Sequence, residues 1–174
     1  MALYLIELTP ATASKDEATA LIETVSNSLS EGAELIETQV SADHKLIFAI
    51  IESENTAFAP ALTAAIGEHA SVVGPDEVRL VGAELDDIKK LKKDADYLVE
   101  WDIPAEITME QYLTRKKANA PKYAEVPEVS FLRTYVREDT AKCLCFYDAP
   151  DEDAVLRARK AVSTPIDRLF KLHA

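Results

Sequence analysis

The sequence contains few of the residues from which common active sites are built. Its 174 residues include four glycines, two cysteines and three histidines. Four glycines leave little material for a phosphate-binding loop or a dinucleotide-binding fingerprint, and neither pattern occurs. The G-x-S-x-G motif of many hydrolases is also missing. No two histidines have the spacing of a helical metal-binding pair, so any metal or catalytic site would be assembled from distant segments.

Basic residues and long apolar runs are scarce as well. The chain has 19 Lys and Arg against 31 Asp and Glu, a net charge of −12. Nucleic acids and anionic membranes require a basic surface, so we expect neither as a partner. No apolar run approaches the roughly 20 residues that cross a bilayer, and the first residues show no signal-peptide pattern. We therefore expect a cytoplasmic protein.

The two cysteines, Cys143 and Cys145, stand two residues apart in a predicted strand. Both side chains would point to one face of it, and a disulfide between them would be strained. A secreted disulfide framework is therefore not indicated. Two thiolates on one strand face could converge on one metal ion, although buried cysteine usually serves as a small apolar residue.

Short segments recur at a separation of about 90 residues. Residues 4–8 (YLIEL) return as 97–101 (YLVEW), and residues 35–40 (LIETQV) return as 131–136 (FLRTYV). A repeat of this length has the size of a small domain. We predict a first repeat at residues 1–82, a charged connector at 83–95 and a second repeat at 96–174.

Hydrophobic patterns predict the order strand, helix, strand, strand, helix, strand in each half. The predicted strands are residues 3–9, 34–41, 45–52 and 77–82, then 97–102, 129–137, 141–148 and 166–172. Helices should begin after Ser14, near Phe58, after Thr108 and after Asp151. This order is typical of the α+β ferredoxin-like fold. Because several strands are apolar on both sides, we predict two tandem ferredoxin-like repeats packed sheet to sheet as an α/β-barrel pseudo-dimer.

Three motifs in the second half resemble a known family. They are residues 97–104 (YLVEWDIP), 145–155 (CFYDAPDEDAV) and 165–169 (PIDRL). Together they resemble the small nickel-binding, ferredoxin-like proteins, a family of unknown function. The resemblance covers about residues 96–173 and reaches residues 3–82 only through the internal repeat. It implies a barrel of ferredoxin-like units that binds nickel or another divalent metal ion.

The leading hypothesis is therefore a non-enzymatic binding protein that takes up a divalent metal ion. Imidazole and carboxylate groups suit nickel(II), and thiolates suit softer ions. The candidate ligands are His44, Cys143, Cys145, Asp151 and Glu152. Asp151 and Glu152 stand at a predicted helix start, where the helix dipole alone favours carboxylates.

Two alternatives remain open at the level of sequence. In the first, the chain is an α/β-barrel enzyme or small-molecule-binding protein that uses a cavity between the sheets. Trp101, Tyr135 and Tyr147 would then line the cavity. In the second, the chain is a structural or interaction module without a ligand. The expected partners are a metal ion or a small molecule, with self-association beyond the internal pseudo-dimer left open.

Overall fold

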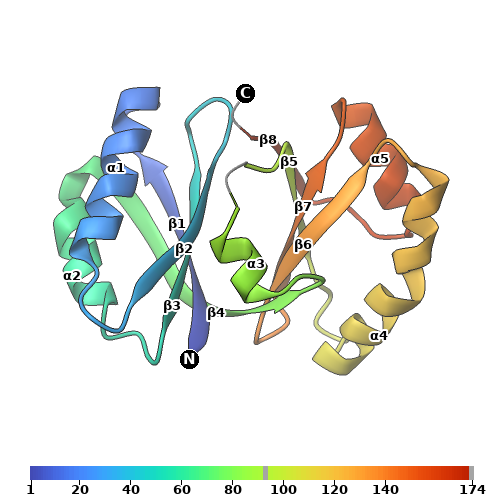
Figure 1. The fold of residues 1–174 in the computed structure, drawn as a ribbon, viewed down its shortest axis with the longest axis horizontal. Coiled ribbons are helices and arrows are strands. Elements are labelled where there is room, and N and C mark those ends of the chain that lie inside the picture. The colour runs from blue at the N-terminus through green and yellow to red at the C-terminus, as the bar shows by residue number, and fades with distance from the viewer. Residues whose placement is uncertain (92–93, 173–174) are drawn as a thin grey trace. The chain divides into compact units, whose positions relative to one another are not determined.

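The computed structural model describes residues 1–91 and 94–172. These residues form eight strands and five α-helices, divided between two compact units (Figure 1). Unit 1 comprises Met1–Val78 and Leu85–Asp94, and unit 2 comprises Arg79–Glu84 and Ala95–Leu172. The predicted mixture of helices and strands is confirmed. Within the described ranges, no helix has the length and apolar character needed to span a bilayer.

Unit 1 has a sheet with the strand order β2-β3-β1-β4. As predicted, α1 begins after Ser14, whose side chain accepts a hydrogen bond of 3.1 Å from the Glu17 amide; Gly67 ends α2. The elements are β1 (Ala2–Pro10), α1 (Lys15–Ser28), β2 (Glu34–Val40), β3 (Ile47–Ser53), α2 (Ala59–Ile66), β4 (Ala70–Val81) and α3 (Leu85–Lys89). The short helix α3 occupies part of the predicted charged connector.

Strand β4 begins at Ala70, well before the predicted start at residue 77. The prediction was wrong because Gly74 and Pro75 are typical strand breakers. The structure accommodates both at a shift in the pairing register between β1 and β4. Gly74 has a φ of +103°, and a Cβ atom there would lie 2.4 Å from the Leu5 carbonyl oxygen. Only glycine suits this close approach of two strands.

Unit 2 has a sheet with the strand order β6-β7-β5-β8. Thr108 and Gln111 form the predicted capping box of α4, and Asp151 caps α5. The elements are β5 (Tyr97–Asp102), α4 (Met109–Asn119), the 3-10 helix η2 (Ala120–Glu125), β6 (Ser130–Arg137), β7 (Lys142–Asp148), α5 (Glu152–Ala161) and β8 (Arg168–Lys171). The strand pairs of both sheets are antiparallel.

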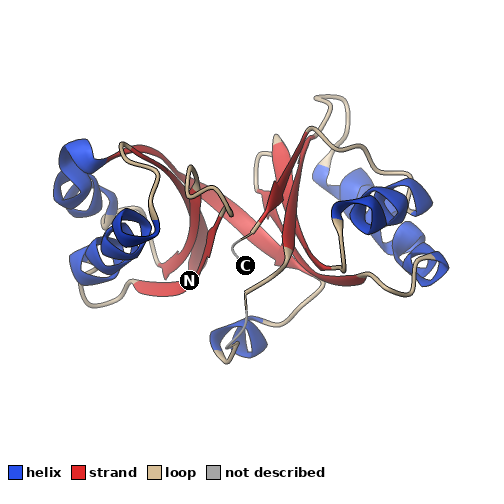
Figure 2. Ribbon diagram, turned by 90° about the horizontal axis from the view of Figure 1, so that it is seen from above, coloured by secondary structure: helices blue, strands red, loops and turns tan. Residues whose placement is uncertain are grey.

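Helices α1 and α2 cover one face of the sheet in unit 1, and α4 and α5 cover one face of the sheet in unit 2 (Figure 2). In unit 2, alternate residues of β7 therefore have different surroundings. Cys143 and Cys145 belong to the apolar cluster that includes α4 and α5. Leu144 and Phe146 point to the other face and are buried as well. The helical face of this sheet carries the candidate site.

Candidate functional site

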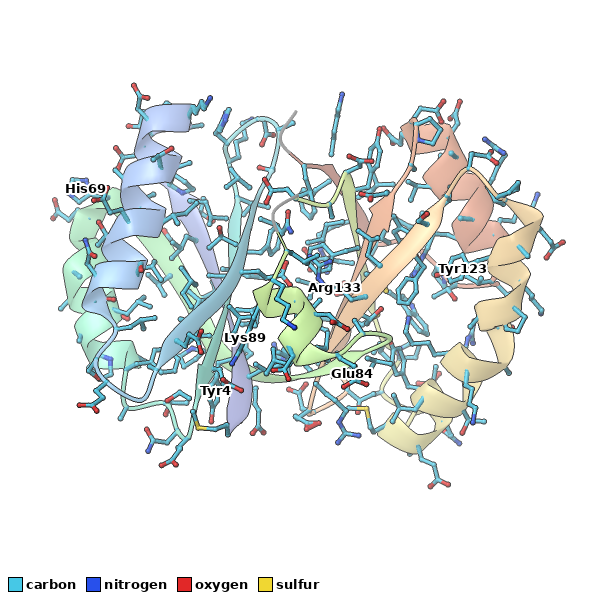
Figure 3. All side chains as sticks on the ribbon, in the orientation of Figure 1. Tyr4, His69, Glu84, Lys89, Tyr123 and Arg133 are labelled. Carbon is cyan, nitrogen blue, oxygen red and sulfur yellow. The ribbon has the colours of Figure 1, made fainter. Side chains whose placement is uncertain are left out.

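A pocket lies within unit 2 between the sheet and the helices α4, η2 and α5. Its empty volume is about 440 Å³, which includes space open to solvent at the mouth. The lining residues are Trp101, Tyr112, Arg115, Lys116, Asn119, Ala120, Tyr123, Phe131, Cys143, Cys145, Arg159, Val162 and Thr164. Figure 3 shows Tyr123 on this helical side of β6 and β7, and Arg133 on the other.

Strand β7 contributes two cysteine thiols to the lining of the pocket. Cys143 and Cys145 are each 1% exposed, and their Sγ atoms lie 4.0 Å apart. The Thr134 hydroxyl donates a hydrogen bond of 3.2 Å to the Cys145 sulfur. A hydrogen bond from Cys143 lowers the pKa of the Cys145 thiol; Lys116 and Arg159 also lower it, against the effect of burial. The same pairing, together with burial, raises the pKa of Cys143.

Arg159 is a buried cation beside these thiols. It lies on α5, is 2% exposed, and donates to the Tyr147 hydroxyl over 3.1 Å and to the Pro165 carbonyl over 2.7 Å. Neither acceptor is a carboxylate. Its Nε atom has no hydrogen-bond partner among the described residues. Burial opposes the charge on Arg159, but the neighbouring Cys145 and Tyr147 raise its pKa.

Two tyrosine hydroxyls continue the hydrogen-bond network of Arg159. The hydroxyl oxygens of Tyr123 and Tyr147 lie 2.6 Å apart. Burial raises the pKa of Tyr147, and it raises the pKa of Tyr123 to about 12. Both hydroxyls are therefore neutral near pH 7 and do not balance the charge of Arg159.

Two further cations, on α4, reach the pocket over aromatic rings. The Arg115 guanidinium lies 5.4 Å from the centre of the Trp101 ring, and the Lys116 ammonium lies 4.3 Å from the centre of the Phe131 ring. Arg115 also donates to the Ser163 carbonyl, and its Nε has no partner among the described residues. Cation–π contacts hold these charges without neutralising them. The lining residues that the structure describes include no Asp or Glu, so this pocket is positive in an acidic chain.

The structure brings some of the predicted small-molecule residues together. Trp101 lines the pocket with both cysteines, and Tyr147 lies directly behind it through its hydrogen bonds to Tyr123 and Arg159. Tyr135 faces away, packed edge to face against Phe146 at 5.9 Å between ring centres. The described pocket lies within unit 2, so the cavity predicted between two sheets stays a prediction.

The five predicted metal ligands are not assembled into one centre in the described structure. Asp151 accepts a hydrogen bond of 2.8 Å from the Ala154 amide as the cap of α5, and Glu152 is exposed in the first turn. His44 lies in a turn of unit 1 with a φ of 60°. Residues 1–91 and 94–172 contain no group of three or more His, Cys, Asp and Glu that could hold a metal ion. A metal role for these five residues stays a prediction.

The sequence interpretation missed the cations of the pocket. Arg159 could have been recognised from the sequence. It stands four residues after Val155 and three before Val162, so helical spacing places it on the same buried side of α5 as these two residues. An arginine at an apolar position of an amphipathic helix is unusual and often functional. Arg115 and Lys116 could not be recognised in this way, because they stand beside Lys117 in a run of basic residues that is typical of a solvent-exposed helix end.

Comparison with known proteins agrees with the resemblance seen in the sequence. Residues 97–172 match the family model described as nickel-responsive protein SCO4226-like. Unit 2 resembles the SCO4226-like proteins. A solved relative, SCO4226 from Streptomyces coelicolor A3(2), is 17% identical and covers 44% of this chain and 94% of its own, with a TM-score of 0.38. No curated protein matches the sequence.

Two solved structures are similar over nearly the whole chain. A candidate chlorite dismutase aligns with a TM-score of 0.60 at 14% identity, over 100% of this chain and 96% of its own. A candidate monooxygenase from Fusobacterium nucleatum aligns with a TM-score of 0.54 at 13% identity, over 98% of this chain and 90% of its own. At these identities the similarity establishes the fold alone.

Proposed function

We propose that the chain is a binding protein and that the pocket of unit 2 takes a small oxyanion, such as a carboxylate or phosphate. The observation that carries this proposal is Arg159, a guanidinium 2% exposed with no carboxylate partner and an unpartnered Nε at the pocket. An unpaired buried charge is costly, and proteins normally pair such a group. A bound anion would supply the missing partner.

The charge of the lining supports an anion in particular. Arg115, Lys116 and Arg159 contribute three positive charges, and the described lining contributes no carboxylate. Ionisation of Cys145 would neutralise one of them and leave a net positive pocket. Guanidinium groups hold planar and tetrahedral oxyanions through several directed hydrogen bonds, which makes arginine the preferred residue for such ligands.

The pocket has room for a small anion. Its volume of about 440 Å³, part of it open to solvent, accommodates acetate, bicarbonate or phosphate. Trp101 and Phe131 line the pocket with their aromatic rings, so an apolar substituent of a carboxylate could extend along them.

Titration by nitrogen-15 NMR tests the proposal at Arg159 itself. The Arg159 Nε–H signal, assigned by its loss in Arg159→Lys, should move saturably as sodium phosphate or sodium acetate is added. The Nε–H signal of Arg157, an exposed residue of the same helix paired with Glu128, should stay in place. An Arg159 signal that does not move more than the Arg157 signal at 100 mM of either salt would reject the anion site.

Nickel binding is the second candidate function, because the family that residues 97–172 match is described as nickel-responsive. Its proposed ligands remain His44, Cys143, Cys145, Asp151 and Glu152. Native mass spectra recorded after nickel addition and desalting test this candidate. Retention of nickel by the wild type and its loss in His44→Ala and Asp151→Ala would support it, whereas an unshifted mass would reject it.

We also infer that the two units are tandem ferredoxin-like repeats packed sheet to sheet as a pseudo-dimer. The support is the shared strand order and the burial of Leu144 and Phe146 on the face of β7 away from the helices. A crystal structure tests the arrangement. Sheets that do not face each other would contradict it and would also remove the cavity required by the enzyme alternative.

A further inference from the structure

The distance between the two sulfur atoms in unit 2 is suitable for two ligands of one metal ion. Their Sγ atoms lie 4.0 Å apart on one face of β7, with both side chains reduced. An ion bonded to both sulfurs at about 2.3 Å, the length of zinc–thiolate bonds, would subtend an S–metal–S angle of about 120°. That angle belongs to a three-coordinate ion with two protein ligands and one ligand from the pocket.

The small number of protein ligands at the two sulfurs favours an ion of low coordination number. Structural zinc requires four protein ligands, and nickel(II) typically adopts four-coordinate or higher geometries. The described residues offer no third His, Cys, Asp or Glu at these sulfurs. Soft thiolates select copper(I), which tolerates low coordination numbers.

The positive charges around the two sulfurs also favour a monovalent ion over a divalent one. Two thiolates and one monovalent cation form a unit of net charge −1. Arg159 and Lys116 act on Cys145 as positive charges and would stabilise this anionic unit. They would repel a hard divalent ion that brought further positive charge into the pocket.

We propose that Cys143 and Cys145 together bind one soft monovalent ion of the copper(I) class in the pocket of unit 2. Both thiols give up their protons as the ion binds: two R–SH, one Cu⁺ and one neutral ligand L from the pocket, such as a water molecule, yield one three-coordinate [Cu(SR)₂L]⁻ unit and two H⁺, with no change of oxidation state. The pocket, which both cysteines line, provides the entry path to sulfurs that are 1% exposed. This inference does not depend on the small-oxyanion site, although both involve Arg159.

Anaerobic titration with copper(I) against a colour-forming copper(I) chelator tests the proposal. The wild type should withdraw one copper per chain from the chelator, with release of two protons measured in weak buffer. Cys143→Ser and Cys145→Ser should each lose this capacity. Arg159→Met should keep the stoichiometry and lose about tenfold in affinity, the usual effect of a group around the ligands. Arg157→Met is the matched control on the same helix and should bind as the wild type does.

Three results would overturn the proposal. They are a wild type that leaves all copper with the chelator, single serine variants that retain copper, and zinc or nickel retained as tightly as copper. Cysteine-to-alanine variants with a native circular-dichroism spectrum repeat the test in case a serine hydroxyl disturbs the core. Failure here stays distinguishable from failure of the oxyanion site, because the Arg159 Nε–H signal reports that site without copper.

Discussion

The Arg159 guanidinium donates a hydrogen bond of 3.1 Å to the Tyr147 hydroxyl inside unit 2. Burial raises the pKa of Tyr147, so its hydroxyl remains neutral and does not balance the charge of Arg159. The tyrosine fixes the position of the guanidinium, and the guanidinium keeps its positive charge for whatever occupies the pocket. The proposed oxyanion site follows from this relationship.

Replacement of Arg159 by methionine should remove ligand-dependent stabilisation without unfolding the protein. Loss of an unpaired buried charge is often neutral or stabilising, so the free energy of unfolding without anion should fall by no more than about 1 kcal/mol. For the wild type, a ligand at a hundred times its Kd should add about 2.7 kcal/mol. Urea unfolding with and without phosphate measures both quantities. A phosphate effect that survives in Arg159→Met, or one that is lost in Arg157→Met, would contradict the assignment.

The two cysteines should ionise in separate steps. The hydrogen bond from Cys143, with Lys116 and Arg159, lowers the pKa of Cys145, so one thiolate should form below the ordinary thiol pKa of 9.0. The other should form above it, because the pKa of Cys143 is raised. Ultraviolet absorbance of the thiolates against pH measures the two steps, which belong to the pair. Cys145→Ser should abolish the early step; a single joint step near 9.0 in the wild type would refute the prediction.

Replacement of Tyr123 by phenylalanine should weaken unit 2. It deletes one hydroxyl of the 2.6 Å pair with Tyr147, and a lost buried hydrogen bond costs about 1 kcal/mol. Tyr4 offers a matched control because it is a buried tyrosine of unit 1 whose ring packs on Phe58 at 5.8 Å between ring centres, away from the Tyr123–Tyr147 pair. Tyr4→Phe should change the free energy of unfolding by less than about 0.5 kcal/mol. Equal losses in the two variants would mean that the hydroxyl pair contributes nothing.

Replacement of Gly74 by alanine should be far more harmful than replacement of Gly32. Both glycines have positive φ angles, +103° and +94°, so both variants carry the same kind of backbone strain. Only at Gly74 would the added methyl group also meet the Leu5 carbonyl oxygen at 2.4 Å; nothing lies within 4 Å at Gly32. Thermal melting should show at least about 1 kcal/mol more destabilisation for Gly74→Ala. Comparable melting temperatures would show that β1 and β4 separate easily.

The sequence predicted the features that depend on neighbouring residues. The caps at Ser14, Thr108 and Asp151 were predictable because each cap bonds to an amide three residues later. The shared face of Cys143 and Cys145 followed from the period of a strand. The path of β4 through Gly74 and Pro75 was not predictable, because the register shift is set by its pairing with β1.

The pocket itself depends on contacts between segments that are distant in the sequence. Lys116, Cys145 and Arg159 come from α4, β7 and α5. Their convergence is decided by the packing of helices on the sheet, which periodicity alone does not specify. The sequence therefore predicted the thiols as candidate ligands and has one unusual arginine, Arg159, on the apolar side of a helix, but it gave no reason to expect Arg115 and Lys116 beside them.

Anomalous diffraction from crystals containing selenate tests the central claim most directly, since selenate is an oxyanion with a strong anomalous scatterer. The account predicts a selenium peak in the pocket of unit 2, with an oxygen atom within hydrogen-bonding distance of Arg159 Nε, and no peak there in Arg159→Met crystals. A pocket without selenium at saturating selenate, or the same peak in the Arg159→Met protein, would contradict the account.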